Sequence, residues 1–164
     1  MGDLGKLVEL HRQGMTIDER TVEVAAFGGH LTCINYLYKQ RCRSDIYACI
    51  AAAFSGHLEC LIFLHNTGCP VDERTCEAAA YRGNLECLNY LHLSGCPWDT
   101  FTFSAAACGG HLQVLKYLRI NGCPWDACTF AGADVCGKLE NIQYLKRNGC
   151  PPDLQTFCKY IISW

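Results

Sequence analysis

The sequence has no excess of positive charge, no long apolar run and no apolar leader. Among its 164 residues, 14 Lys and Arg stand against 16 Asp and Glu, a formal net charge of −2, which gives no electrostatic reason to expect a nucleic-acid partner. The longest uninterrupted apolar stretch runs from Tyr47 to Phe54, far short of the ~18 residues of a membrane span. The first residues, MGDLGKLVEL, place charges where a signal peptide needs its apolar region. We therefore expect an intracellular protein, cytoplasmic or nuclear, with no membrane partner.

The sequence also lacks the motifs of common active sites. It contains no Cys-x-x-Cys, and its closest cysteine pair is Cys123 and Cys128. There is no glycine-rich phosphate loop and no grouping of Ser, His and Asp. We predict that the protein is not an enzyme and that it has no catalytic residues, no cofactor and no metal ligands.

What the sequence has in abundance is cysteine, with fourteen residues, and a 27-residue period. Gly95-Cys-Pro-Trp-Asp99 returns unchanged 27 residues later, and aspartates recur at 18, 45, 72, 99, 126 and 153. A Gly-His-Leu motif recurs at the same 27-residue interval, as at Gly29-His-Leu31 and Gly56-His-Leu58. The period divides one domain, 1–164, into a half repeat (1–17), five full repeats (18–44, 45–71, 72–98, 99–125, 126–152) and a trailing half repeat (153–164).

Each repeat contains two stretches with helical spacing. The first, such as DERTCEAAAYRG from Asp72, is rich in alanine, and the second, such as NLECLNYLHLSG from Asn84, has apolar residues at a 3.6-residue period. The pentapeptide GCPWD, between the second stretch of one repeat and the first stretch of the next, predicts a turn. Gly95 ends one helix, Pro97 prevents its continuation, and Asp99 caps the next helix. The expected fold class is all-α, a solenoid of stacked helix-turn-helix repeats.

These residues resemble the ankyrin repeat. The stretch Ala52-Ala-Phe-Ser-Gly-His-Leu-Glu59, followed by a leucine-rich second helix, is similar to the ankyrin helix-turn-helix core and recurs five times. The departure is the period, because the usual ankyrin unit has ~33 residues and a β-turn finger. The short GCPWD form is similar to arrays of large amoeba-infecting DNA viruses and some protists, so a host–virus role is implied by resemblance. The resemblance implies a stack of helix pairs that binds proteins and carries no catalytic residues.

The cysteines fit structural positions. Five of them recur three residues before an aspartate of the period, four of these after a glycine, and three more recur at one position of the second helix. Stacked helices lie ~8–10 Å apart, while the Cα atoms of a disulfide lie within ~4.4–6.8 Å, so equivalent cysteines cannot easily bridge. We expect all fourteen thiols to be free. The alternative function is a metal- or redox-responsive cysteine-rich helical repeat protein.

The histidines also follow the period. His30, His57 and His111 share a position with Asn84 and Lys138, which favours a role in the turn between helices over metal binding. His65 and His92 are expected on the outer face of the second helix, in solvent.

One face of the first helices changes from repeat to repeat, while the capping, alanine and leucine positions scarcely change. It comprises the second, fifth and ninth residues after each aspartate cap. Aromatic residues and arginine are typical of interface cores. The structural alternative is that the ninth residues only fill space between repeats. We predict a partner-binding site at Arg20, Tyr47, Ile50, Phe54, Arg74, Glu77, Tyr81 and Phe101.

The functional hypothesis is therefore a non-catalytic scaffold that binds a protein partner through the concave face and loops of an ankyrin-type array. We expect a monomer with no nucleic-acid partner.

Overall fold

The computed structural model describes residues 3–151, which form eleven α-helices and no strand. The first helices of the repeats are α2 (Glu19–Phe27), α4 (Ile46–Ser55), α6 (Glu73–Arg82), α8 (Thr100–Gly109) and α10 (Ala127–Val135). The second helices are α3 (Leu31–Lys39), α5 (Leu58–Asn66), α7 (Leu85–Leu93), α9 (Leu112–Ile120) and α11 (Leu139–Arg147), and α1 (Leu4–Arg12) precedes them all. The trailing half repeat lies outside the described residues. Within residues 3–151, no helix has the length and apolarity needed to span a membrane.

The helices begin and end where the motifs predict. The side chains of Asp99 and Asp126 accept hydrogen bonds from amides in the first turns of α8 and α10, and a threonine three residues on completes each capping box. At the other end of a helix pair, Gly95 and Gly122 have φ of 80° and 76°, a left-handed conformation that glycine adopts without a steric penalty. The pentapeptide between the repeats is a turn, as predicted.

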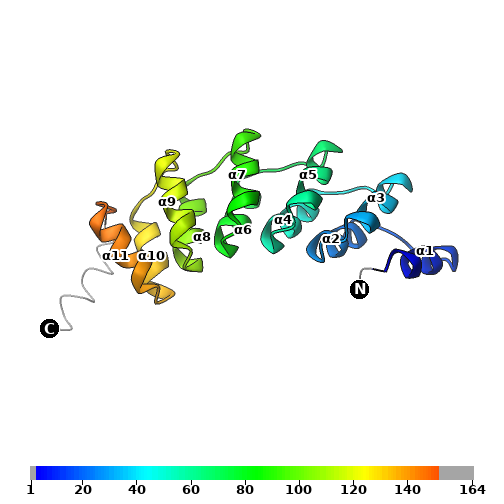
Figure 1. The fold of residues 1–164 in the computed structure, drawn as a ribbon, viewed down its shortest axis with the longest axis horizontal. Helices are drawn as coiled ribbons and strands as arrows, with labels where there is room; N and C mark the ends of the chain where they lie inside the picture. Colours follow the sequence, from blue (N-terminus) through cyan, green and yellow to red (C-terminus); the bar gives the residue numbers. More distant parts are fainter. Residues whose placement is uncertain (1–2, 152–164) are drawn as a thin grey trace.

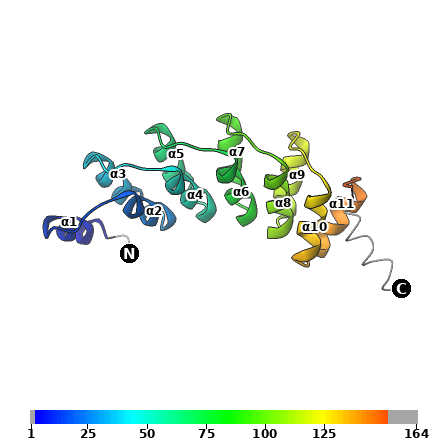
Figure 2. The ribbon, with the colours of Figure 1, turned by 180° about the vertical axis from the view of Figure 1, so that it is seen from behind.

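The two kinds of helix form two layers of an arch. The first helices line its inner side and the second helices its outer side, so the array is concave along the first helices (Figure 1). Figure 2 shows the same arrangement from behind. Alanines such as Ala79 and Ala80 are fully buried and let neighbouring first helices approach closely, whereas Leu88 and Leu91 fill the space between the layers. The all-α stacked-pair fold is confirmed.

The cysteine that lies three residues before each of the aspartates 45, 72, 99, 126 and 153 closes its own repeat. The Cys69 thiol donates a hydrogen bond to the backbone carbonyl of Asp45, 24 residues earlier, over 2.8 Å. Four other repeats have the same contact, at 3.1–3.4 Å, from Cys42, Cys96, Cys123 and Cys150 to Asp18, Asp72, Asp99 and Asp126. The thiol thus ties the turn after the second helix to the cap of the first.

The second helices are linked by pairs of side chains 25 residues apart. His65 Nδ1 shares a 2.9 Å hydrogen bond with the Tyr90 hydroxyl, and the His92 ring meets Tyr117 edge to face. His92 also stacks on Trp98 with ring centroids 3.8 Å apart. The prediction that these two histidines lie in solvent is wrong, because stacking brings the eighth residue of one second helix against the sixth of the next.

The histidines of the Gly-His-Leu motif have a different role. His57 and His111 lie over the turn glycine of the preceding repeat: a Cβ added to Gly29 would collide with the ring of His57, and one added to Gly83 with His111. Both glycines also have positive φ. This confirms a role for these histidines in the turn.

Candidate partner-binding surface

The eight predicted partner-binding residues lie on four adjacent first helices, α2, α4, α6 and α8. We call the second, fifth and ninth positions of the first helices the concave surface. The second-position residues Tyr47 and Phe101 are 52% and 63% exposed, although both are large and apolar. The fifth-position residues Ile50 and Glu77 are half-buried. The concave surface therefore combines exposed aromatic rings with a more recessed row between them.

The ninth positions form a row of stacked rings. Phe27, Phe54 and Tyr81 follow one another with centroids 6.3 and 6.4 Å apart and interplanar angles of 23° and 14°. The Arg82 guanidinium lies 4.9 Å from the centre of the Phe54 ring. Phe27 and Tyr81 nevertheless remain 56% and 44% exposed. The row therefore fills space between repeats and also presents apolar surface, and Phe27 extends it beyond the predicted site.

The charged residues of the concave surface have different surroundings. Arg74 is tied to the cap of its own helix, since its Nε and Nη2 donate to Asp72 Oδ2 over 2.9 and 2.8 Å. Glu77 has no hydrogen bond or ion pair within the described chain. Burial, together with the carboxylates of Asp99, Glu73 and Asp72, raises the pKa of Glu77 above its usual value, and the opposing effect of Arg74 is smaller. Arg74 thus forms its ion pair with Asp72 and leaves Glu77 without one.

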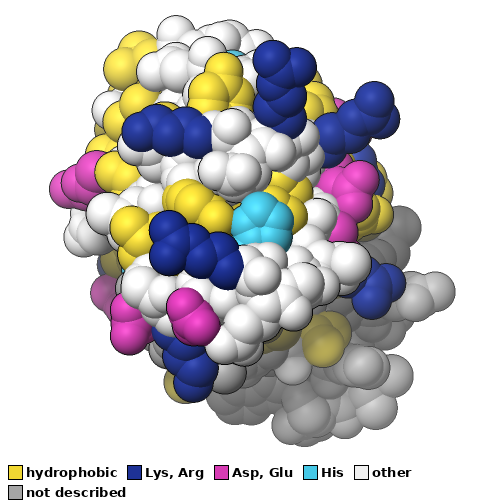
Figure 3. All heavy atoms as spheres, turned by 90° about the vertical axis from the view of Figure 1, so that its right-hand side faces the viewer, with side chains coloured by type: hydrophobic (Ala, Val, Ile, Leu, Met, Phe, Trp, Pro, Cys, Tyr) yellow, Lys and Arg dark blue, Asp and Glu magenta, His cyan; other side chains and the backbone are white. Residues whose placement is uncertain are grey.

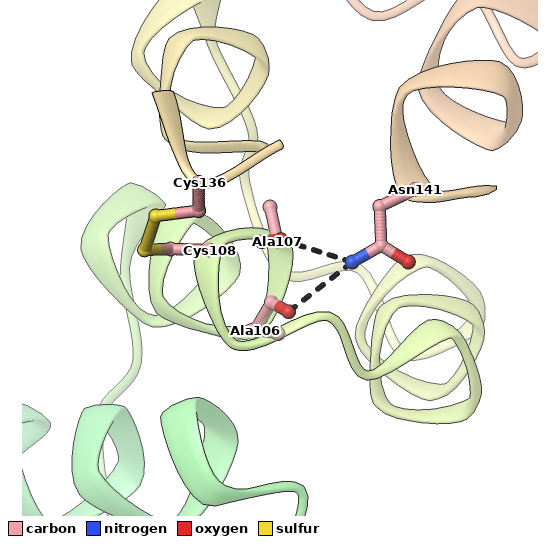
Figure 4. Close-up of a disulfide and its surroundings, with 5 residues drawn as sticks. All are labelled: Ala106, Ala107, Cys108, Cys136 and Asn141. Atoms are coloured by element: carbon pink, nitrogen blue, oxygen red, sulfur yellow. Dashed lines mark hydrogen bonds between the residues drawn. A yellow bond between two sulfur atoms is a disulfide. The ribbon is translucent and has the colours of Figure 1, made fainter. Parts of the chain in front are cut away.

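One cysteine pair contradicts the expectation that every thiol is free. Cys108, at the ninth position of α8, forms a disulfide with Cys136, the C-cap of α10, and their Cα atoms are 5.3 Å apart (Figure 4). The spacing argument considered equivalent positions only, whereas these residues are the ninth and tenth after their caps. Close packing of α8 on α10 helps to bring the two cysteines together. The packing is close enough that a Cβ on Gly132 would lie 3.3 Å from the Ser104 carbonyl oxygen.

The other described cysteines are structural. Eleven are free, nine of these are buried, Cys42 is half-buried and Cys128 is exposed. Burial raises the pKa of Cys60, Cys87 and Cys150 to about 11 and that of Cys123 to about 12, so these four thiols stay protonated and unreactive at neutral pH. In residues 3–151, no group of three His, Cys, Asp or Glu side chains could hold a metal ion.

A buried amide lies beside the disulfide. Asn141 takes the place of Cys87 in the fifth repeat, and its Nδ2 donates to the carbonyl oxygens of Ala106 and Ala107 at 3.5 and 2.9 Å (Figure 4). Its Oδ1 is buried with no hydrogen-bond partner. Asn141 and the disulfide both join the fifth repeat to α8.

A second concavity lies at the N-terminal end. Leu7, Leu10, Met15 and Val24 help to line a cleft of about 400 Å³ between α1 and α2. Figure 3 shows this end, with hydrophobic side chains visible between Lys and Arg side chains. The cleft exists because α1 corresponds to the second helix of a repeat and has no first helix before it among residues 3–151. Within that range, α2 therefore has a first-helix neighbour, α4, on one side only.

The fold has a counterpart among solved structures. No protein-family model matches the sequence, and no curated protein matches it. The ankyrin repeat domain of human ASB11 superposes with a TM-score of 0.66 over 79% of this chain and 69% of that chain, at 18% sequence identity. An identity this low concerns the fold alone. The chain has the ankyrin-repeat fold.

Proposed function

We propose that the chain is a non-catalytic scaffold that binds a protein partner along the concave surface. The observation that carries the proposal is the exposure of large rings where solvation alone would favour polar side chains: Tyr47, Tyr81 and Phe101 lie on three adjacent first helices and are 44–63% exposed. Interface energy concentrates in aromatic and arginine residues. Arg20 and Arg74 alternate with Tyr47 and Phe101 at the second position of successive first helices.

In this proposal the chain acts as a monomer inside cells. It consists of five full repeats, from 18–44 to 126–152, and a half repeat at each end. The short 27-residue repeat supports a resemblance to viral and protist arrays, and with it a partner that is a host protein.

The second candidate function is redox response, and the Cys108–Cys136 pair favours it. Glutathione keeps most cytosolic thiols reduced, so inside a cell this pair would change with the redox state. Differential alkylation of the native protein, with and without reductant, reports the state of the pair, and partner affinity measured under the same two conditions separates the two functions. A redox-responsive protein loses or gains partner affinity on reduction, whereas a simple scaffold does not.

The scaffold is tested by a triple substitution on the concave surface. A partner is first identified by affinity pull-down with mass spectrometry. Tyr47→Ala, Arg74→Ala and Phe101→Ala together are then expected to weaken its binding at least about tenfold, a loss of ~1.4 kcal/mol, with nearly unchanged helical circular dichroism.

The matched control replaces three exposed residues of the second helices, Leu93→Ala, Lys116→Ala and Ile120→Ala, and is expected to bind like the wild type. Equal weakening by both triple variants, or by neither, would move the binding site away from the concave surface.

A further inference from the structure

The two layers of the array have opposite charge. The first helices with their aspartate caps (18–27, 45–55, 72–82, 99–109 and 126–135) contain ten Asp and Glu but three Lys and Arg. The second helices with their connecting turns (28–44, 56–71, 83–98, 110–125 and 136–151) contain three Asp and Glu but eight Lys and Arg. The net charge of −2 conceals this separation. The arch is acidic on its inner side and basic on its outer side.

The few cations of the inner layer are already engaged near its centre. Arg74 is paired with Asp72, and Arg82 lies over the Phe54 ring. The Glu77 carboxylate is half-buried and forms no ion pair in the described chain, and the nearby Arg74 pairs with Asp72 instead. Partial burial weakens its solvation, and a lysine or arginine from outside would restore a counter-charge.

Glu77 also has exposed rings on both sides. Tyr47 on α4 and Phe101 on α8 belong to the repeats before and after it, and Tyr81 follows it on the same helix. Aromatic rings attract cations and the aliphatic stems that carry them. A carboxylate between exposed rings suits a basic side chain better than an acidic or a small polar one.

Glu23 supplies a second carboxylate at the equivalent fifth position of α2, with Ile50 of α4 between the two. Adjacent packed helices lie ~8–10 Å apart, so the two carboxylates are separated by roughly 16–20 Å. An extended chain advances ~3.3–3.6 Å per residue and covers that distance in about five residues.

We propose that the partner presents an extended, basic and apolar segment to the concave surface, with two Lys or Arg residues about five apart. One basic side chain pairs with Glu77 between the aromatic rings, the other pairs with Glu23, and the intervening apolar residues contact Ile50 and Phe54. This inference rests on the proposed function, because it names the chemistry of the partner for the same surface.

The test uses a phage-displayed library of random peptides, selected on the immobilised full chain. The peptides that distinguish the wild type from the Tyr47→Ala, Arg74→Ala, Phe101→Ala variant are synthesised, and their affinities are measured by fluorescence anisotropy. We expect them to be enriched in Lys and Arg at the stated spacing. Raising NaCl from about 0.1 M to about 1 M shortens the screening length from ~10 to ~3 Å and is expected to weaken their binding about tenfold or more.

The acidic residues are then tested directly. Glu23→Gln with Glu77→Gln is expected to weaken these peptides at least about tenfold, a change of ~1.4 kcal/mol. The control, Glu59→Gln with Glu86→Gln, makes the same change in net charge on α5 and α7 and is expected to leave affinity unchanged. Since the raised pKa of Glu77 means that its ionised form disfavours the folded state, Glu77→Gln is not expected to unfold the chain.

The outcomes separate this inference from the proposed function. Selected peptides that depend on the concave surface but lack basic residues, or that bind the Glu23 and Glu77 variant unchanged, overturn the basic-segment proposal and leave the scaffold function standing. A selection that yields no peptide able to distinguish the wild type from the triple variant overturns the binding surface itself.

Discussion

The third and fifth repeats differ in what holds them in the array. In the third repeat (72–98), Ala79, Ala80 and Leu88 are fully buried, and α6 packs between α4 and α8. In the fifth repeat, Asp134 takes the second alanine position, and the described neighbour of α10 among the first helices is α8. The Asn141 amide donates to carbonyls of α8 much as the Asn84 amide of the third repeat donates to Ala53 and Phe54 of α4. The disulfide is the link that the third repeat does not have. Where repeated packing weakens, a covalent bond is added.

The largest expected effect comes from opening the core of the third repeat. Leu88→Ala is expected to lower the free energy of unfolding by ~2–5 kcal/mol, because a fully buried leucine leaves a cavity that its neighbours on both sides cannot fill. The measurement is urea denaturation followed by circular dichroism. Ile142→Ala, at the equivalent buried position of the fifth repeat, is expected to cost less, because the terminal repeat can unfold locally. Equal losses would show that the array unfolds as one unit.

Reduction of the disulfide is expected to destabilise the fifth repeat alone. Loss of a cross-link between residues 28 apart lowers stability by about 2–4 kcal/mol. Hydrogen exchange of peptides from 126–151 is expected to accelerate on reduction, while peptides from 72–98 keep their protection. A Cys108→Ser, Cys136→Ser variant serves as the control, since it should exchange like the reduced protein and ignore the reductant. Uniform acceleration in both regions would contradict a local role.

The smallest expected difference concerns the capping threonines. Thr75 and Thr129 are buried, and the hydroxyl of each accepts a hydrogen bond from the amide of its cap, Asp72 or Asp126. Replacing either threonine by valine is expected to cost ~0.5–1.5 kcal/mol. The Thr129 hydroxyl also lies 3.4 Å from Ser104 Oγ on α8, so Thr129→Val is expected to be the more costly change. Thermal denaturation of both variants decides the order, and the reverse order would mean that this contact between repeats contributes nothing.

Much of the fold could be predicted because each repeat contains the same local sequence signals. Aspartate caps, turn glycines and alanine pairs act over a few residues, and each recurs four or more times. The positions that vary between these signals led to the predicted concave surface, but at the ninth position the fold uses some of them, since Phe27, Phe54 and Tyr81 stack between repeats.

Contacts between neighbouring repeats could not be predicted so well. The pairing of His65 with Tyr90 depends on how far one second helix is displaced along the next, which no local pattern records. Cys108 and Cys136 occupy different positions in their repeats, so a comparison of equivalent residues missed them. The ion pair between Arg74 and Asp72, the cap of its helix, could have been predicted, since the two residues are only two apart in the sequence.

The contact from the cysteine near the end of each repeat to the aspartate carbonyl of the same repeat has an evolutionary consequence. The bond begins and ends within one unit, and the buried alanines and leucines that pack one unit against the next recur at the same positions. A gene that loses or duplicates one such unit therefore joins surfaces that already fit each other. The array can change length by recombination, one repeat at a time, while its inner face acquires a new order of variable residues.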